Sequence, residues 1–276
     1  CTFCHISQQK EDRDILGNIG FLKMFSPQRV SEDVDRAVKL GVTRIYFEDD
    51  NLFFNKKRLV NLVPYLKREN LSYSLVNGGN LRFLVDKSNG YYKPDQEFIN
   101  ALASFGLKEL TLPFETKNKE MMKKYATGKF DPEEMDPIGI VKSLKKAGIR
   151  AGSNFLIGFR DESWESILET KNFAKTLFSE GLDQAGFHIP VPYPGTKDFE
   201  FQMSKPDIKK DFNKNLFKYT DNMHVRGKPM FYTEVPGEKL TAAVKDFWLE
   251  LNPSEYTKST QSINLSKPED KRPYEH

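Results

Sequence analysis

The sequence is poor in cysteine and has no long hydrophobic run. Cys1 and Cys4 are the only cysteines in 276 residues. Two cysteines three positions apart cannot form the disulfide framework of a small secreted domain. No apolar run approaches the roughly 18 residues that a membrane-spanning helix needs, and no signal peptide is visible. We therefore expect a cytoplasmic protein without a membrane span.

The sequence also lacks a strong excess of charge. It holds 42 Lys and Arg against 39 Asp and Glu, a formal net charge of +3. The basic runs at 205–218 and 258–272 are interspersed with acids, which is typical of a solvated surface. This balance is no argument for a nucleic-acid partner, so we expect a small-molecule substrate.

A repeated helix–glycine–strand unit is the main pattern that is present. Helical apolar periodicity ends at a glycine, and a β-rich run follows it. The first unit opens at Ser26-Pro27, a helix cap followed by proline, and closes at Gly41. Further helices are predicted at 57–69, 98–105, 138–147 and 164–180, and strands at 42–47, 71–76, 107–114, 149–157 and 182–191.

Alternating strands and helices predict parallel strands joined by right-handed crossovers. The sheet is then either doubly wound or a β/α barrel. The cysteines precede the first helix and the chain starts without Met, so we expect a piece of a longer protein whose first strand lies before residue 1. Restoring it gives an α/β fold, a partial (β/α)6 TIM-like barrel over 1–205. A helical extension is expected over 206–256, with helices at 209–219 and 240–251, and a polar, disordered tail over 257–276.

Polar residues and glycines lie where the predicted strands end. Chemistry in parallel β/α folds occurs at this carboxyl edge. Each feature also has a structural explanation, as a helix cap or a tight turn, but their shared position favours a site. They are Glu48-Asp49-Asp50-Asn51, Asn77-Gly78-Gly79-Asn80 with Arg82, Glu115, Gly158 to Glu162, and Pro190 to Thr196.

The cysteine pair has the spacing C-x-x-C. This spacing suits an iron–sulfur cluster, half of a zinc site or a redox pair. A four-iron cluster held by three cysteines leaves one iron open to a small molecule. Asp49 and Asp50 are suited to an ammonium group, Glu115 to a ribose, and the strand backbone at 155–158 to an adenine.

The sequence resembles the radical S-adenosylmethionine (SAM) superfamily. Its hallmark is C-x-x-x-C-x-aromatic-C, and Cys1, Phe3 and Cys4 match the second cysteine, the aromatic residue and the third cysteine. The first cysteine would lie four residues before Cys1. Five further segments are similar to the branch that often carries an N-terminal cobalamin-binding domain: 26–30, 47–51, 114–116, 155–162 and 192–196.

Two segments depart from the family pattern. Thr116-Lys117 stands where the family usually has Ser-Gly after the glutamate. Arg160-Asp161 replaces Pro-Gly, although Gly158 and Glu162 are kept.

The resemblance implies a partial barrel of radical SAM type with a [4Fe-4S] cluster, SAM and, through a missing upstream domain, cobalamin. It implies a 5′-deoxyadenosyl radical that abstracts hydrogen from an unidentified substrate, methyl transfer where cobalamin is present, and an electron donor of flavodoxin or ferredoxin type. The metal ligands would be Cys1 and Cys4. The cofactor-binding residues would be Phe3, Glu48, Asp49, Asp50, Asn77, Glu115, Asn154, Ile157, Gly158 and Pro192.

Two alternatives remain open on the residues alone. One is a non-radical β/α-barrel enzyme that uses Asp49, Asp50 and Glu115 with a divalent cation. The other is a zinc-stapled binding module with Cys1, Cys4, His5 and a further ligand such as an Asp, a Glu or one of the other histidines. The other histidines are His188, His224 and His276. Strand-end position makes Arg82, His188 and Tyr193 candidates for the substrate cavity.

Overall fold

The computed structural model describes residues 1–4, 14, 24–49, 51–88, 91–126, 128–131, 133–206, 209 and 233–252. Its main sheet has five parallel strands in the order β1-β2-β5-β6-β7. They are β1 (Arg44–Phe47), β2 (Ser72–Leu75), β5 (Leu107–Glu115), β6 (Arg150–Leu156) and β7 (Gln184–His188). The predicted α/β fold with five parallel strands is confirmed.

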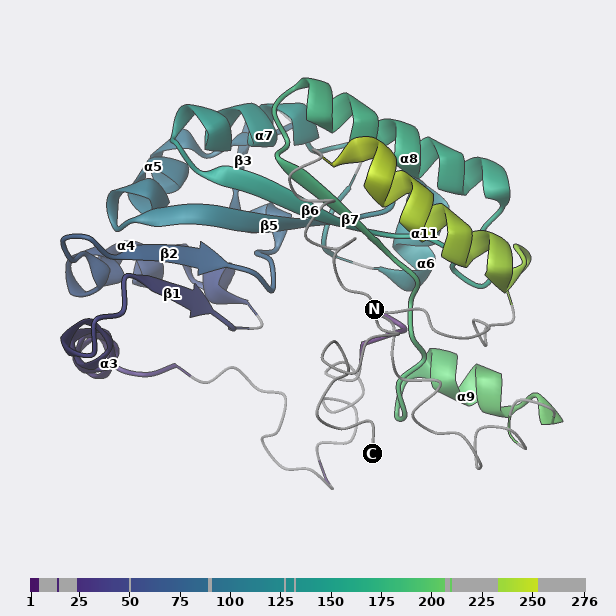
Figure 1. Ribbon diagram of the computed structural model, residues 1–276, viewed down its shortest axis with the longest axis horizontal. Coiled ribbons are helices and arrows are strands. Elements are labelled where there is room, and N and C mark those ends of the chain that lie inside the picture. Colours follow the sequence, from purple (N-terminus) through teal and green to yellow (C-terminus); the bar gives the residue numbers. More distant parts are fainter. Residues whose placement is uncertain are drawn as a thin grey trace, which may run out of the picture.

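Helices connect these strands and cover one face of the sheet (Figure 1). Those predicted from the sequence are α3 (Pro27–Lys39), α4 (Lys56–Leu66), α5 (Gln96–Ser104), α7 (Pro137–Lys146), α8 (Trp164–Ser179) and α11 (Gly237–Leu251). Side-chain caps explain why several of these helices begin where they do. Ser26 accepts a hydrogen bond from the Arg29 N–H, and Asp136 and Ser163 cap α7 and α8 in the same way.

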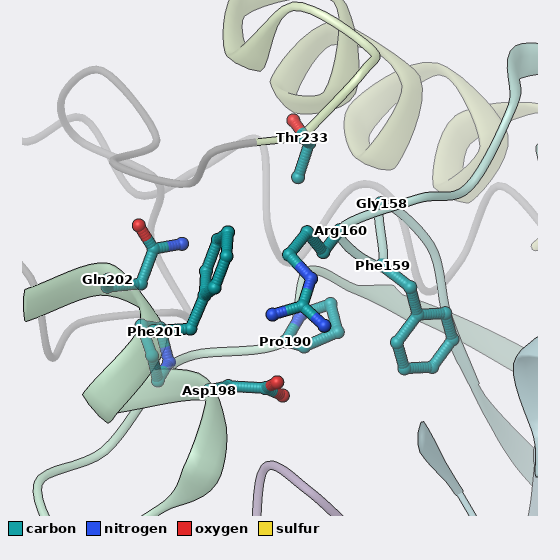
Figure 2. Close-up of a pocket in the computed structure, with 9 residues that line it drawn as sticks. Gly158, Phe159, Arg160, Pro190, Asp198, Phe201, Gln202 and Thr233 are labelled. Atoms are coloured by element: carbon teal, nitrogen blue, oxygen red, sulfur yellow. The ribbon is translucent and has the colours of Figure 1, made fainter. Parts of the chain in front are cut away.

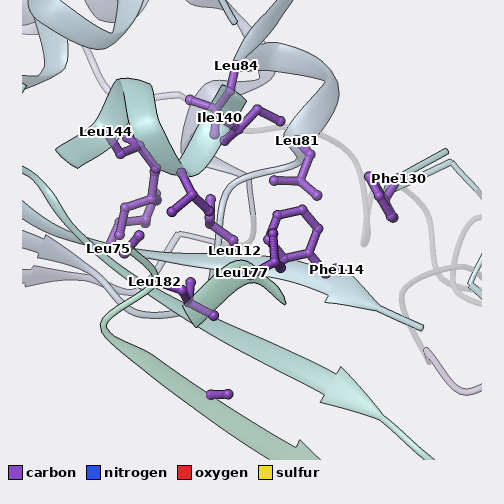
Figure 3. Close-up of a cluster of buried hydrophobic side chains, with 14 of the residues drawn as sticks. Leu75, Leu81, Leu84, Leu112, Phe114, Phe130, Ile140, Leu144, Leu177 and Leu182 are labelled. Atoms are coloured by element: carbon purple, nitrogen blue, oxygen red, sulfur yellow. The ribbon is translucent and has the colours of Figure 1, made fainter. Parts of the chain in front are cut away.

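The two faces of the sheet differ in polarity because side chains alternate along a strand. The face under the helices is mainly apolar. Ile45 and Phe47 of β1 are half-buried there, and the buried side chains are Tyr73, Leu75, Leu110, Leu112, Phe114, Ala151, Phe155, Ala185 and Phe187. Figure 3 shows side chains from β2, β5 and α7 gathered in this core. The opposite face, called the inner face below, carries Arg44, Ser74, Glu109, Thr111, Gly152, Asn154, Gln184, Gly186 and His188.

Several short elements were not anticipated from the sequence. They are the antiparallel pair β3 (Val85–Ser88) and β4 (Tyr91–Pro94), the 3-10 turns η1 (Leu52–Phe54) and η2 (Leu81–Phe83), and helices α6 (Lys119–Tyr125) and α9 (Lys197–Met203). These short elements do not follow the helix–glycine–strand order that reveals most strands of the main sheet, and their own length gives only weak periodicity. The helix predicted at 209–219 lies outside the described residues except for residue 209, as does the tail 257–276.

Helix α11 packs directly on the end of the sheet. The Phe247 ring lies 5.2 Å from the Phe187 ring of β7. Asn252 follows the helix and binds the free edge of β7: its Oδ1 accepts from the Ala185 N–H at 3.0 Å, and its Nδ2 donates to the Ala185 carbonyl at 2.9 Å. One side chain thus satisfies two backbone groups that an edge strand would leave unpaired. Within the described ranges, no helix has the length and hydropathy to cross a membrane.

Replacing Asn252 with Ala should lower the free energy of unfolding by about 1–3 kcal/mol, because two buried backbone groups lose their partner. Urea unfolding measures the change. The matched control is Asn100→Ala on the exposed surface of α5, which should stay within about 0.5 kcal/mol of wild type. Equal effects of the two substitutions would contradict this account.

Candidate functional site

The cysteine pair is held at the carboxyl edge of the sheet. The Thr2 N–H donates to the Tyr125 carbonyl at the end of α6 at 3.0 Å, and the Thr2 hydroxyl donates to the Asp198 carboxylate in α9 at 2.8 Å. The Phe3 ring lies 6.3 Å from the Phe159 ring, just after β6. Residues 1–4 therefore lie against segments that follow β5, β6 and β7.

Phe3 belongs to a small apolar cluster separate from the main core. The cluster is built on Met121, Tyr125 and Phe159, with Phe3 and Leu156 packed against it. Cys1 and Cys4 are half-buried and are not joined by a disulfide, and the Cys4 N–H donates to the Cys1 carbonyl at 3.3 Å. Among the described residues, no three His, Cys, Asp or Glu side chains lie close enough together to hold a metal ion. Two thiols alone do not complete a cluster site.

Glu115 ends β5 in an unusual backbone conformation. Its φ is +61°, and the β5–β6 register shifts between Pro113 and Glu115. Left-handed backbone at a residue other than glycine is strained and occurs often at functional sites. The Glu115 side chain is only 4% exposed and forms an ion pair with Lys129, whose ammonium lies 5.8 Å from the Phe3 ring centre. Glu115 is thereby connected to the cysteine segment.

Gly158 begins the turn after β6 and has a φ of +82°. A Cβ at this position would lie 2.6 Å from the Leu240 side chain of α11, so only glycine fits. The fully buried Glu162 fastens the turn, because its carboxylate accepts from the N–H groups of Gly158 (2.7 Å) and Phe159 (3.2 Å) and from the Ser166 hydroxyl (2.9 Å). Burial raises the pKa of Glu162 to about 7, although these hydrogen bonds lower it.

The ends of β1 and β2 are also joined. The Asn77 Nδ2 donates to the Glu48 carbonyl at 2.9 Å and to the Glu48 carboxylate at 3.1 Å. Asp49 is exposed, and Asp50 lies outside the described residues. The Asn51 Oδ1 is buried without a hydrogen-bond partner. An unpartnered buried acceptor is costly, so this position suits a ligand that brings a donor such as an ammonium group.

Asn154 and His188 meet on the inner face, with the His188 Nε2 3.3 Å from the Asn154 Oδ1. Burial lowers the pKa of His188, while the negative charge of Glu115 acts in the opposite direction. Ile157, the residue directly after β6, donates its N–H to the His188 carbonyl at 3.0 Å. The polar pair thus lies beside the predicted Ile157–Gly158 segment and within the electrostatic reach of Glu115.

A small cavity opens beside Gly158 (Figure 2). Its volume of about 20 Å³ holds roughly one water molecule. The Arg160 guanidinium stacks 4.0 Å from the Phe201 ring centre. The lining residues are Gly158, Phe159, Arg160, Pro190, Pro192, Asp198, Phe201, Gln202 and Thr233. The cavity puts Pro192 near Gly158, but it is too small for a nucleoside.

The structure favours neither alternative site. Glu115 is paired with Lys129 rather than free to bind a divalent cation. His188 is hydrogen-bonded to Asn154, and the other three histidines lie outside the described residues. Of the remaining substrate-cavity candidates, Arg82 is exposed in η2 and Tyr193 is exposed in the loop after β7.

A family model described as the radical SAM superfamily matches residues 1–174. The chain belongs to this superfamily. The uncharacterized methyltransferase PH0819 of Pyrococcus horikoshii is 27% identical over 250 residues, which are 90% of this chain and 49% of that protein. The chain therefore spans about half the length of this curated relative.

Two solved radical SAM structures have similar folds. Coproporphyrinogen III oxidase (HemN) of Escherichia coli is 15% identical, with a TM-score of 0.48 over 78% of this chain and 48% of that one. The methyltransferase TsrM of Kitasatospora setae is 15% identical, with a TM-score of 0.49 over 64% of this chain and 32% of that one. The family assignment rests on the family model rather than on these likenesses.

Sequence reasoning did not single out Lys129 or Asp198. The Thr2–Asp198 contact joins residues 196 positions apart, so no local pattern reveals it. Lys129 could have been noticed as a cation in the segment that follows Glu115, but nothing in the spacing predicts that its ammonium reaches that carboxylate.

Glu162 predicts a distinct pH dependence of stability. Its folded-state pKa of about 7 lies above the ordinary value of 4.5. Between these values the folded protein keeps the proton and the unfolded chain loses it, so stability falls as the pH rises through this window. The loss should be on the order of 3 kcal/mol. Glu162→Gln keeps a hydrogen-bond acceptor but cannot ionise. The variant should therefore lack the fall in stability between pH 4.5 and about pH 7 that Glu162 causes. Urea unfolding of both proteins at about pH 5 and about pH 7.5 tests it, and equal pH dependence would refute it.

A second prediction concerns the Asn154–His188 pair. Asn154→Asp places a carboxylate beside the imidazole and should raise the pKa of His188 by roughly 1–3 units. An NMR titration of the histidine signals measures the change. Asn100→Asp on the surface of α5 is the matched control and should leave the His188 signal unaltered. An unchanged pKa in Asn154→Asp would show that the two side chains are not in contact in solution.

Proposed function

We propose that this chain is the catalytic core of an enzyme that binds a [4Fe-4S] cluster and SAM and abstracts hydrogen from a small-molecule substrate. One observation carries the proposal: the cysteine segment shares the carboxyl edge of the sheet with Glu115 and Gly158. Phe3 packs on Phe159, next to Gly158, and Lys129 lies between the Phe3 ring and the Glu115 carboxylate. Because the chain belongs to the radical SAM superfamily, we interpret this shared edge as the site for the cluster and SAM.

The cluster would be held by the Cys1 and Cys4 thiolates and by a third thiolate. This remaining ligand is the first cysteine of the family motif, which would lie four positions before Cys1. The two thiols are half-buried, and the apolar cluster around Phe3 limits the access of water to one side of them. Thiolate ligation also fits the reducing cytoplasm that the cysteine content predicts.

SAM would lie across the strand ends. The exposed Asp49 and the orphan Asn51 Oδ1 offer acceptors for its ammonium group. Glu115 and Asn154 would bind the ribose, and the Ile157–Gly158 backbone, together with Pro192, would contact the adenine. When bound, the cluster and SAM supply a 5′-deoxyadenosyl radical that removes a hydrogen atom. The protein's own contribution is to bind, orient and exclude water.

Methyl transfer is the reaction we favour. The Pyrococcus relative is described as a methyltransferase, and the resemblance of the acidic segment 47–51 is to the branch that often carries cobalamin. Cobalamin would be held by a domain preceding residue 1. Electrons would come from a flavodoxin or ferredoxin type of donor.

Anaerobic reconstitution of the full-length protein with iron and sulfide tests the proposal. Visible charge-transfer absorbance and 5′-deoxyadenosine, formed from SAM under a chemical reductant, should both appear. Cys4→Ala should abolish both because it removes a cluster ligand. The Asn100→Ala variant is the control and should behave as wild type. Stoichiometric zinc in place of iron, with no deoxyadenosine, would refute the function.

A further inference from the structure

The Asn154–His188 contact on the inner face fixes the protonation of the imidazole. The Asn154 Oδ1 that lies 3.3 Å from the His188 Nε2 carries no hydrogen, so the Nε2 must be the donor. Burial keeps this imidazole neutral at neutral pH by lowering its pKa. Neutral His188 therefore has its proton on Nε2 and a bare Nδ1.

The Asn154 carboxamide faces the imidazole with its oxygen. With Oδ1 turned to His188, the Nδ2 amino group points away from it. No partner for this amino group occurs among the described residues, and it is not one of their buried unpartnered atoms, which are Asn51 Oδ1 and Trp248 Nε1. The amino group is therefore accessible, with two hydrogens to donate.

Gly186 provides the space for this pair. Asn154 and Gly186 are direct neighbours across β6 and β7. A Cβ on Gly186 would lie 2.9 Å from the His188 Nε2 and 3.0 Å from the Asn154 Oδ1, too close to both atoms of the hydrogen bond. Gly152, on the same face, is different. A Cβ there would meet only Gln184, at an ordinary distance of 3.9 Å.

We propose that His188 is a positioning residue for cofactor binding, because it turns the Asn154 amino group toward a ribose hydroxyl. The absence of a side chain at Gly186 leaves room for the hydrogen bond between His188 and Asn154. This inference rests on the proposed function. Glu115 is the neighbour of Phe155, the residue after Asn154, across β5 and β6, and its charge acts on His188. A carboxylate acceptor and an amide donor therefore border one place on the sheet. A ribose cis-diol matches such a pair, since one hydroxyl donates to the carboxylate and the other accepts from the amide.

The test measures binding of S-adenosylhomocysteine and its 2′-deoxy and 3′-deoxy analogues to the reconstituted full-length protein by calorimetry. Wild type should bind each deoxy analogue about tenfold more weakly, as expected for one lost hydrogen bond in each. Gly186→Ala and His188→Leu should bind the parent compound about tenfold more weakly. They should no longer discriminate against the analogue that lacks the hydroxyl bound by Asn154, and should still discriminate against the other. His188→Gln, which keeps a donor, should restore discrimination, and Gly152→Ala should match wild type.

Nitrogen NMR of His188 adds a readout that a purely structural role would not predict. The Nε2 should be protonated and the Nδ1 bare at neutral pH. A bare Nε2, or full discrimination in both His188→Leu and Gly186→Ala, would overturn the positioning role while leaving the proposed function intact. Loss of discrimination in Gly152→Ala as well would also overturn it. A wild-type protein that binds no S-adenosylhomocysteine and forms no deoxyadenosine would instead refute the proposed function, and this inference with it.

Discussion

Two hydrogen bonds from Thr2 hold the cysteine segment in place, and the arrangement of the candidate site depends on them. One reaches the Tyr125 carbonyl and the other the Asp198 carboxylate, 196 residues away in the sequence. A contact between such distant residues forms only after the sheet is assembled, because the entropy of closing a long loop must be offset first. The sheet therefore orders the cysteines, and the apolar contact of Phe3 with Phe159 adds to the two hydrogen bonds.

The polarity of the sheet explains where ligands can approach. A closed TIM barrel fills its interior with branched aliphatic side chains. Here the inner face instead carries Ser74, Thr111, Asn154 and Gln184, with two glycines among them. Stability comes from the other face, where aromatic and aliphatic side chains pack under the helices. Because the apolar side chains pack on one face, the inner face can carry polar side chains that bind a ligand without reducing the hydrophobic core.

The sequence predicted the parts that depend on local periodicity. Helix stripes, glycine stops and β-rich runs identified all five parallel strands within a few residues, because each pattern is contained in one element. The position of Glu115 at a strand end was also predictable. Its left-handed backbone and its pairing with Lys129 were not. The first accompanies a register shift between β5 and β6, and the second is a tertiary contact that no local pattern encodes. The β3–β4 pair was missed because its strands, Val85–Ser88 and Tyr91–Pro94, contain charged residues and a proline and lack the β-rich run of the main strands.

The two departures from the family pattern are compensated by contacts that the structure makes visible. Thr116 keeps the hydroxyl that the usual serine would supply. This hydroxyl lies 3.1 Å from that of Thr170 in α8 and accepts the Asn118 N–H. Asp161, in place of the glycine, accepts from the Tyr125 hydroxyl at 2.8 Å. The turn after β6 is thus tied to α6, whose last residue also holds Thr2. Here hydrogen bonds hold the turn in which the family usually has Pro-Gly. They also connect the Gly158 turn to the cysteine segment through one residue, Tyr125.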